Sequence, residues 1–142
     1  LDMRILLAVD GSPYTQKMLD YLASHPEWLG NTHHYVALTV QPPLPPRAVK
    51  ALGKDLVADY YAEEAQKVLA PVHQFVEAHK LDAQCDSKIG HIADTIAEMA
   101  DTGGYDLLIM GTRGYTALAK LVMGSVATQV LAQSKTPVLL IR

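Results

Sequence analysis

RILLAVDGSP, residues 4–13, joins a run of apolar side chains to a turn and the start of a helix. Positions 5–9 are all apolar, which is typical of a strand covered on both faces, as in a parallel sheet. Ser12 is a favourable helix N-cap, and Pro13 suits the first helical position. The apolar residues that follow keep helical spacing: Tyr14, Met18, Leu19 and Leu22. The stretch therefore predicts a buried strand, a tight turn and a helix.

The alternation of strand and helix continues along the rest of the chain. Apolar runs predict strands at 35–40, 106–110 and 137–141. Residues 83–89 are predicted as a further strand, and their more polar character favours a position at a sheet edge. Five strands joined by right-handed crossovers predict an α/β fold, a single-domain open five-stranded parallel sheet with helices on both faces. In the order 3-2-1-4-5 the first and fourth strands would flank a topological switch point, where ligands bind outside the carboxyl ends.

The segments between the strands differ in regularity. Four prolines between positions 42 and 46 predict an extended loop. Apolar spacing predicts a long helix over 48–79, which Pro71 should kink or split near Val68. Trp28 and Leu29 are expected to pack back on the domain, and 111–123 is expected to form a glycine-bearing loop with a short amphipathic segment.

Composition and charge narrow the class of protein. The 142 residues suit one domain, 49% are hydrophobic, and the net charge is −3, which gives no support to binding of nucleic acid or an anionic membrane. Cys85 is the single cysteine, which favours a cytoplasmic location, and no apolar run approaches the ~20 residues of a membrane span. Leu1 and Asp2 precede Met3, where we expect the native chain to begin, so the domain is expected to span 3–142.

Glycines near the C-terminus form the pattern with the clearest chemistry. Gly111 and Gly114 follow the fourth strand, and after nine further residues Gly124 and Ser125 begin a helix. Glycine can turn through positive φ and let the backbone approach a ligand closely. Backbone N–H groups of such a loop and of a helix start can face one anion. The pattern suits a polyphosphate.

Other phosphate-binding patterns are absent from the sequence. It contains no G-x-x-x-x-G-K-[ST] loop, and no G-x-G-x-x-G follows the first strand. Taken alone, Gly111 and Gly114 could equally be turn glycines, and Gly124 could relieve crowding at a helix. The spacing therefore leaves both interpretations open.

Three segments together resemble the universal stress protein family. They are the opening RILLAVDGS, the segment MGTRG with MGSVA after it, and the closing TPVLLI; GHIA before the third helix is also similar. G-x2-G-x9-G-[ST] is the ATP-binding pattern of that family, and this chain has every fixed position of it. The resemblance implies the Rossmann-like, adenine nucleotide alpha hydrolase-like fold and a bound ATP or other adenine nucleotide, with Mg²⁺ or Mn²⁺ arriving with it.

Roles for individual residues also follow from the resemblance. It implies that Asp10 contacts the ribose or a phosphate-bound metal ion and that Val40 lines the adenine site. Asp10 could instead be a helix-capping carboxylate, and Arg113 a solvated loop residue. The remaining residues implied to border the ribose and phosphates, or the pocket beside Asp10, are Ala8, Met110, Gly111, Arg113, Gly114, Gly124, Ser125 and Val126.

Other constellations carry less weight. His33 and His34 are adjacent in a strand, so their side chains should point to opposite faces and share no metal ion. No Ser-His-Asp arrangement or G-x-S-x-G elbow is identifiable, and no catalytic residue is assigned. A base distant in sequence could still serve, with His91 as the candidate.

The sequence predicts an ATP-binding regulatory or stress-response protein. The resemblance also implies a homodimer joined through residues 137–141, from Pro137 to Ile141, an apolar strand expected at a sheet edge. One alternative is a slow ATPase or nucleotidyl-transfer enzyme on the same fold. The other is a structural dimer without nucleotide, which the complete glycine pattern disfavours.

Overall fold

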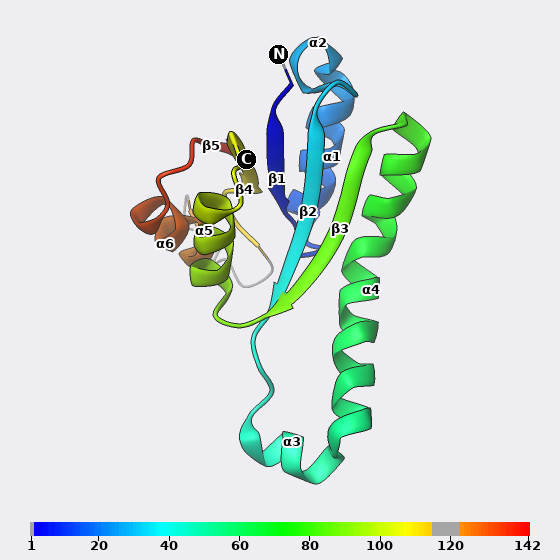
Figure 1. Cartoon of the computed structure of the whole chain (residues 1–142), viewed down its shortest axis with the longest axis vertical. Helices are drawn as coiled ribbons and strands as arrows, with labels where there is room; N and C mark the ends of the chain where they lie inside the picture. Colours follow the sequence, from blue (N-terminus) through cyan, green and yellow to red (C-terminus); the bar gives the residue numbers. More distant parts are fainter. Residues whose placement is uncertain (1, 115–122) are drawn as a thin grey trace.

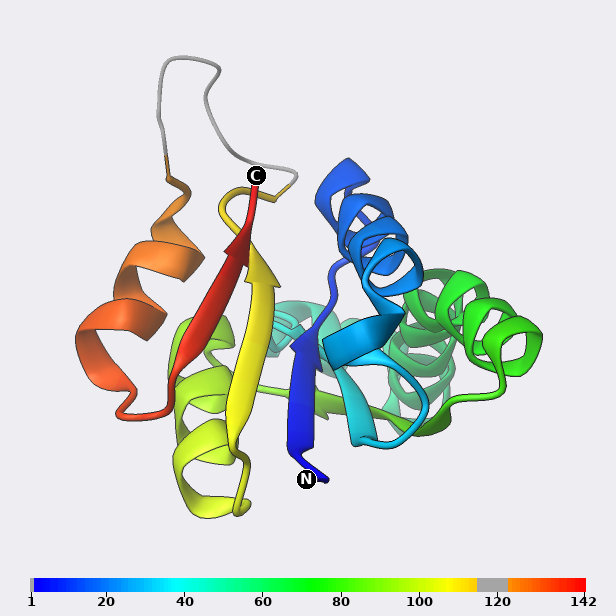
Figure 2. The same ribbon diagram turned by 90° about the horizontal axis from the view of Figure 1, so that it is seen from above.

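Five parallel strands form a single sheet in the computed structural model, which describes residues 2–114 and 123–142. The order is β3-β2-β1-β4-β5, so the predicted topology is confirmed (Figure 1, Figure 2). The strands are β1 (Arg4–Ala8), β2 (His34–Gln41), β3 (Asp82–Ile89), β4 (Leu107–Gly111) and β5 (Val138–Ile141).

Helices cover both faces of the sheet. One face carries α1 and α4, and the other carries α5 and α6 (Figure 1, Figure 2). The helices are α1 (Pro13–Ser24), α2 (Pro26–Leu29), α3 (Pro46–Leu52), α4 (Lys54–His79), α5 (Ile92–Thr102) and α6 (Ser125–Gln133). None of the helices in the described part of the chain is both long and apolar enough to cross a bilayer.

β1 shows why a continuous apolar run is needed at the centre of such a sheet. Ile5 and Leu7 pack with α1 and α4, whereas Leu6 packs with α5 and α6. All three side chains are at most 1% exposed. Because successive side chains of a strand point to opposite faces, a strand covered on both faces must be apolar at every position.

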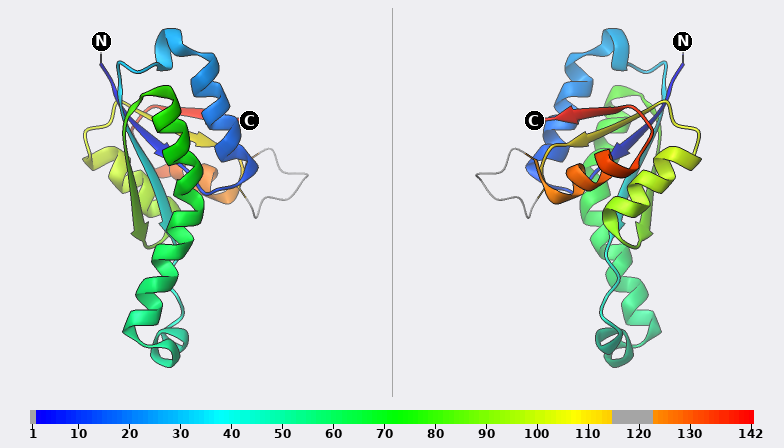
Figure 3. Two further views of the ribbon diagram at one scale, coloured as in Figure 1. Left: turned by 90° about the vertical axis from the view of Figure 1, so that its right-hand side faces the viewer. Right: turned by 90° about the vertical axis from the view of Figure 1, so that its left-hand side faces the viewer.

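The long helical segment breaks at a different residue from the one predicted. α4 runs through Pro71 without interruption, so the predicted split near Val68 is wrong. Leu69 and Val72 on either side of Pro71 are buried, and this packing offsets the missing hydrogen bond. The interruption lies at Gly53, where φ is +85°. α3 and the first turns of α4 project beyond the sheet (Figure 1, Figure 3).

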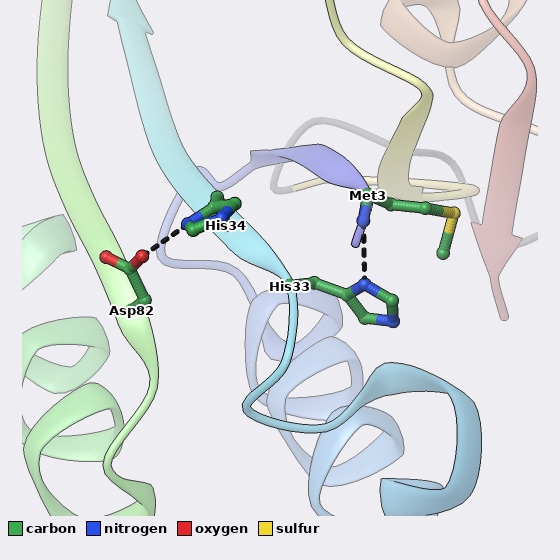
Figure 4. Close-up of polar contacts among 4 residues, drawn as sticks. All are labelled: Met3, His33, His34 and Asp82. Carbon is green, nitrogen blue, oxygen red and sulfur yellow. Dashed lines mark hydrogen bonds and ion pairs between the residues drawn. The ribbon is translucent and has the colours of Figure 1, made fainter. Parts of the chain in front are cut away.

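His33 fastens the segment before β2 to the start of β1. Its Nδ1 accepts a hydrogen bond from the Met3 N–H (2.9 Å; Figure 4). Nε2 therefore carries the ring proton and donates to the Trp28 carbonyl (2.7 Å). Leu29 is buried as predicted, and Trp28, although 39% exposed, packs back on the Tyr21 ring of α1. The two rings meet edge to face, with their centres 6.1 Å apart.

His34 points away from His33 and pairs with Asp82 of β3 (Figure 4). The two imidazoles therefore point in opposite directions, as their adjacent positions in the chain predict. Across residues 2–114 and 123–142, no three His, Cys, Asp or Glu side chains gather in a group that could hold a metal ion.

Asp101 organises the turn between α6 and β5. Its carboxylate accepts hydrogen bonds from the hydroxyls of Ser134 (2.7 Å) and Thr136 (2.8 Å) and from the Lys135 N–H (3.0 Å). The Ser134 and Thr136 hydroxyls, followed by the backbone N–H groups, lower the pKa of Asp101 below its ordinary value of 3.8. The ionised carboxylate is the form that holds the turn.

The depressed pKa of Asp101 makes its contribution to stability pH-dependent. A lowered pKa in the folded state stabilises the protein above the ordinary pKa, and this contribution is lost as the pH falls through the folded-state value. Asp101→Ala should lower the unfolding temperature at pH 7. The difference from the parent should shrink below pH 3.8, the ordinary value. Thermal denaturation from neutral to acid pH measures it, and a difference that stays constant into acid would contradict this role.

Candidate functional site

A cavity of about 410 Å³ opens at the carboxyl ends of β1 and β4. This is the topological switch point, because the chain leaves β1 toward β2 on one side and β4 leads to β5 on the other. Its volume lies within the range of ~300–1,000 Å³ that is usual for small-molecule sites. The wall includes residues of β2, α1, α5 and α6 as well.

Every residue that the sequence singled out for binding lines this cavity. The set spans three strands, two loops and one helix start: Ala8, Asp10, Val40, Met110, Gly111, Arg113, Gly114, Gly124, Ser125 and Val126. Residues more than 100 positions apart in the chain are thus brought to one cavity. The loop segment 115–122, part of the predicted glycine-bearing loop, lies outside the described residues.

Further residues complete the lining, and sequence reasoning did not assign them to a site. They are Val9, Tyr14, Thr15, Leu38, Ile92, Ile96 and Ala127. The apolar members keep the periodicity of core residues in β2, α5 and α6, so their pattern is that of the core. Leu38 and Ile96 are indeed at most 5% exposed and belong to one apolar cluster, so they form an apolar part of the cavity wall.

The site glycines serve close approach rather than unusual backbone angles. Positive φ occurs at Gly11, Gly53 and Gly104 among the described glycines, and neither Gly111 nor Gly114 has it. A Cβ at Gly111 would lie 2.6 Å from Tyr14 Cβ. A Cβ at Gly124 would lie 3.3 Å from Arg113 Cα. α1 therefore packs on Gly111 through the Tyr14 side chain, and Gly124 packs on the backbone of the loop after β4.

The start of α6 faces this cavity without a side-chain cap. Gly124 is its N-cap, with φ −77° and ψ 165°, and provides no side-chain hydrogen bond. The Gly124 N–H donates to the Thr112 carbonyl (2.7 Å), which ties α6 to the loop after β4. The N–H groups of the first helical turn have no intrahelical partner, and that turn contributes Ser125, Val126 and Ala127 to the cavity wall. Such a helix start can receive an anion.

Ser12 is the N-cap of α1, as predicted, whereas Asp10 braces the turn before it and also lines the cavity. Its Oδ1 accepts hydrogen bonds from the Ser12 N–H (2.9 Å) and the Thr15 hydroxyl (3.2 Å). Its Oδ2 lies next to Gly114. Oδ1 thus organises the turn before α1, and neither of these two hydrogen bonds uses Oδ2.

Arg113 lies beside α1 at the rim of the cavity. Its guanidinium carbon is 5.4 Å from the centre of the Tyr14 ring, a cation–π geometry. His91, the candidate base, is not part of the lining: its Nδ1 caps α5 by accepting from the Asp94 N–H (3.4 Å). Its side chain is 62% exposed, and the ring also faces the Asp94 carboxylate.

The chain matches the model of the universal stress protein family over residues 3–142. It is 30% identical to universal stress protein Slr1230 of Synechocystis over 98% of this chain and 42% of that protein. A universal stress protein of Thermus aquaticus is also 30% identical, with 97% of each chain covered. This chain spans about half the length of several curated relatives, Slr1230 among them.

Solved structures share the fold. The universal stress protein UspA of Lactobacillus plantarum has a TM-score of 0.80 at 21% identity, covering 99% of this chain and 97% of that one. A universal stress protein in complex with cAMP has a TM-score of 0.70 at 21% identity, covering 99% and 97%. An Arabidopsis thaliana family protein with AMP bound has a TM-score of 0.67 at 14% identity, covering 98% and 90%. Since the family model matches almost the whole length, the chain belongs to the universal stress protein family.

Proposed function

We propose that this protein binds ATP in the cavity at the β1–β4 switch point and acts as a nucleotide-dependent regulatory protein. The observation that carries the proposal is the convergence of the glycine pattern, Asp10 and the uncapped start of α6 on one cavity. A polyphosphate needs several donors at one place, and a helix start beside a glycine loop supplies them. The apolar end of the same cavity suits a flat purine ring.

The two ends of the cavity have different chemistry. Val40 and Leu38 of β2, with Ile92 and Ile96 of α5, form an apolar wall suited to adenine. Gly114 and the first turn of α6, which begins at Ser125, stand where the phosphates would lie. Asp10 lies on the same part of the wall as Gly114. Its carboxylate would border the ribose or a phosphate-bound metal ion.

A divalent metal ion would arrive with the nucleotide. Mg²⁺ is usually held by one or two carboxylates together with phosphate oxygens and water. Asp10 is the carboxylate in the described lining, and its Oδ2 is turned to the Gly114 side, so the residues fit an ion of this kind. The ion would neutralise phosphate charge, and Asp10 would supply the protein's ligand to it.

The comparisons support an adenine nucleotide as the ligand class. Two solved structures with this fold are described with cAMP and with AMP. Both molecules share adenine, ribose and phosphate with ATP, although neither carries a triphosphate. We infer the triphosphate from the two donor elements that meet in this chain, at Gly114 and at the start of α6.

We also propose that the protein works as a homodimer in the cytoplasm, joined along β5. β5 is a sheet edge in the single chain, and the strand reads VLLI. A bare apolar edge is prone to uncontrolled strand pairing, and a two-fold partner would cover it. The single, half-buried Cys85 suits a reducing compartment.

Isothermal titration with ATP, ADP, AMP and cAMP, with and without Mg²⁺, tests the proposed ligand. We expect saturable binding that Asp10→Ala weakens, because that variant loses the carboxylate of the cavity wall. His91→Ala is the control, since His91 lies outside the lining and caps α5. Absence of binding by any of the four nucleotides to the parent protein would refute the proposal.

A further inference from the structure

The carboxylate of Asp10 is held through one oxygen by the start of α1. Oδ1 accepts from the Ser12 N–H (2.9 Å) and from the Thr15 hydroxyl (3.2 Å). Asp10 itself lies just beyond β1, in the segment that opens into the cavity. Two donors on the same oxygen restrict rotation of the carboxylate and decide which oxygen remains for other contacts.

Thr15 uses its whole hydrogen-bonding capacity on this turn. Its hydroxyl accepts from the N–H groups of Asp10 and Gly11, both at 3.1 Å, and donates to Asp10 Oδ1. A hydroxyl has one donor and two acceptor lone pairs, so each is occupied. The residue itself is buried, with 6% of its surface exposed. Thr15 therefore fixes both the backbone and the side chain of Asp10.

Gly114 adjoins the other oxygen of the same carboxylate. A Cβ built on Gly114 would fall on Asp10 Oδ2, closer than real Cβ atoms approach an oxygen, with Asp10 Cγ at 3.7 Å as the next atom. The φ of Gly114 is not in the left-handed region, so its backbone angles do not demand glycine. Among the described residues, the Asp10 carboxylate is therefore what a side chain at position 114 would meet.

We propose that Thr15 is a positioning residue for Asp10 and that Gly114 is glycine to make room for the carboxylate so positioned. Thr15 and the Ser12 N–H hold Oδ1, and Oδ2 is directed across the switch point to the loop after β4. The Asp10 carboxylate thus joins the loop after β1 (residues 9–12) to the glycine loop after β4, at Gly114. The positioning of Asp10 for a ligand rests on the proposed nucleotide site, where Oδ2 is the oxygen presented to the ribose or to a metal ion.

The steric part is tested without any ligand, by thermal unfolding of a double-mutant cycle. Gly114→Ala should lower the unfolding temperature in the parent and change it far less in Asp10→Ala, because that background has no carboxylate for the new methyl group to meet. An equal decrease in both backgrounds would overturn the assignment of Gly114.

The positioning part is tested by ATP affinity. Thr15→Val, which keeps the shape and removes the hydroxyl, should weaken binding about tenfold, as expected for one lost hydrogen bond to a charged group. Thr15→Ser should restore the affinity, and in Asp10→Ala the change to valine should cause no further loss. Thr102→Val is the matched control, since its hydroxyl bonds to the Glu98 carbonyl of α5 outside the cavity lining.

The two readouts separate this inference from the proposed function. If the parent protein binds no nucleotide, the proposed function fails, and thermal unfolding still decides the inference. The Asp10–Gly114 cycle tests the steric part. A second cycle tests the positioning part: Thr15→Val should lower the unfolding temperature more in the parent than in Asp10→Ala, because only the parent has the carboxylate that the hydroxyl bonds, and an equal decrease in both would overturn it. If it binds ATP and Thr15→Val weakens binding equally with and without the Asp10 carboxylate, Thr15 is merely structural and the positioning role is wrong.

Discussion

Gly124→Val should abolish ATP binding while leaving the secondary structure intact. A Cβ at Gly124 already lies 3.3 Å from Arg113 Cα and 3.5 Å from the Thr112 carbonyl oxygen, so the valine methyl groups would push the start of α6 away from the glycine loop. Two lost hydrogen bonds to phosphate, at about 1.5–3 kcal/mol each, amount to more than 100-fold in affinity. Titration calorimetry together with circular dichroism measures both quantities.

Gly103→Val is the matched control for Gly124→Val. A Cβ at Gly103 would lie 2.7 Å from the Met99 carbonyl oxygen, at the C-terminal end of α5 and outside the cavity lining. This variant should lose stability and keep its affinity for ATP. If the Gly124 variant were to bind ATP as tightly as the parent protein, the assignment of the α6 start to the phosphates would be wrong.

Leu140→Pro should convert the proposed dimer to monomer. The Leu108 N–H donates to the Pro137 carbonyl and the Thr112 N–H to the Ile141 carbonyl, so these alternate residues of β5 face β4. Leu140 is the neighbour of Ile141, and successive residues of a strand direct their backbone groups to opposite sides. The Leu140 N–H therefore points to the free edge of the sheet. Proline there removes an outward donor and no bond to β4, because edge strands tolerate proline with the N–H side facing out.

Sedimentation velocity of the parent and of Leu140→Pro, at equal concentrations, measures the assembly. Leu140→Met is the control, because it keeps both the outward N–H and a flexible apolar side chain. We expect the methionine variant to remain a dimer. A dimer in the proline variant would place the interface elsewhere, and a monomeric parent would refute the dimer itself.

The strands could be predicted from the sequence because the covering of each strand in the sheet determines which of its positions are apolar. β1 is covered on both faces and reads as a continuous apolar run, whereas β3 at an edge is mostly polar. The break in the long helical segment was harder to predict, since Pro71 is the stronger local signal and Gly53 the weaker one. Packing of Leu69 and Val72 decides that case, and packing is not visible in local propensity.

Some residues of the candidate site could be identified from the sequence, and others could not. Glycines and Asp10 stand out because nothing in a core requires them, so a pattern could identify them. Ile96 could not be recognised, because a residue that lines an apolar cavity and a residue that fills a core follow the same helical spacing. Thr15 looks like an ordinary residue of the first helical turn until its three partners are known.

The central position of β1 has a consequence for the protein during synthesis. Ile5 pairs with Tyr35 on one side and with Leu107 on the other. Ribosomes add ~5–20 residues per second, so the side of β1 that faces β4 stays open for several seconds after the strand has been made. A chain stalled before residue 107 would keep that apolar edge exposed and invite chaperone capture. The cavity at the switch point forms later still, after α6 has left the ribosome.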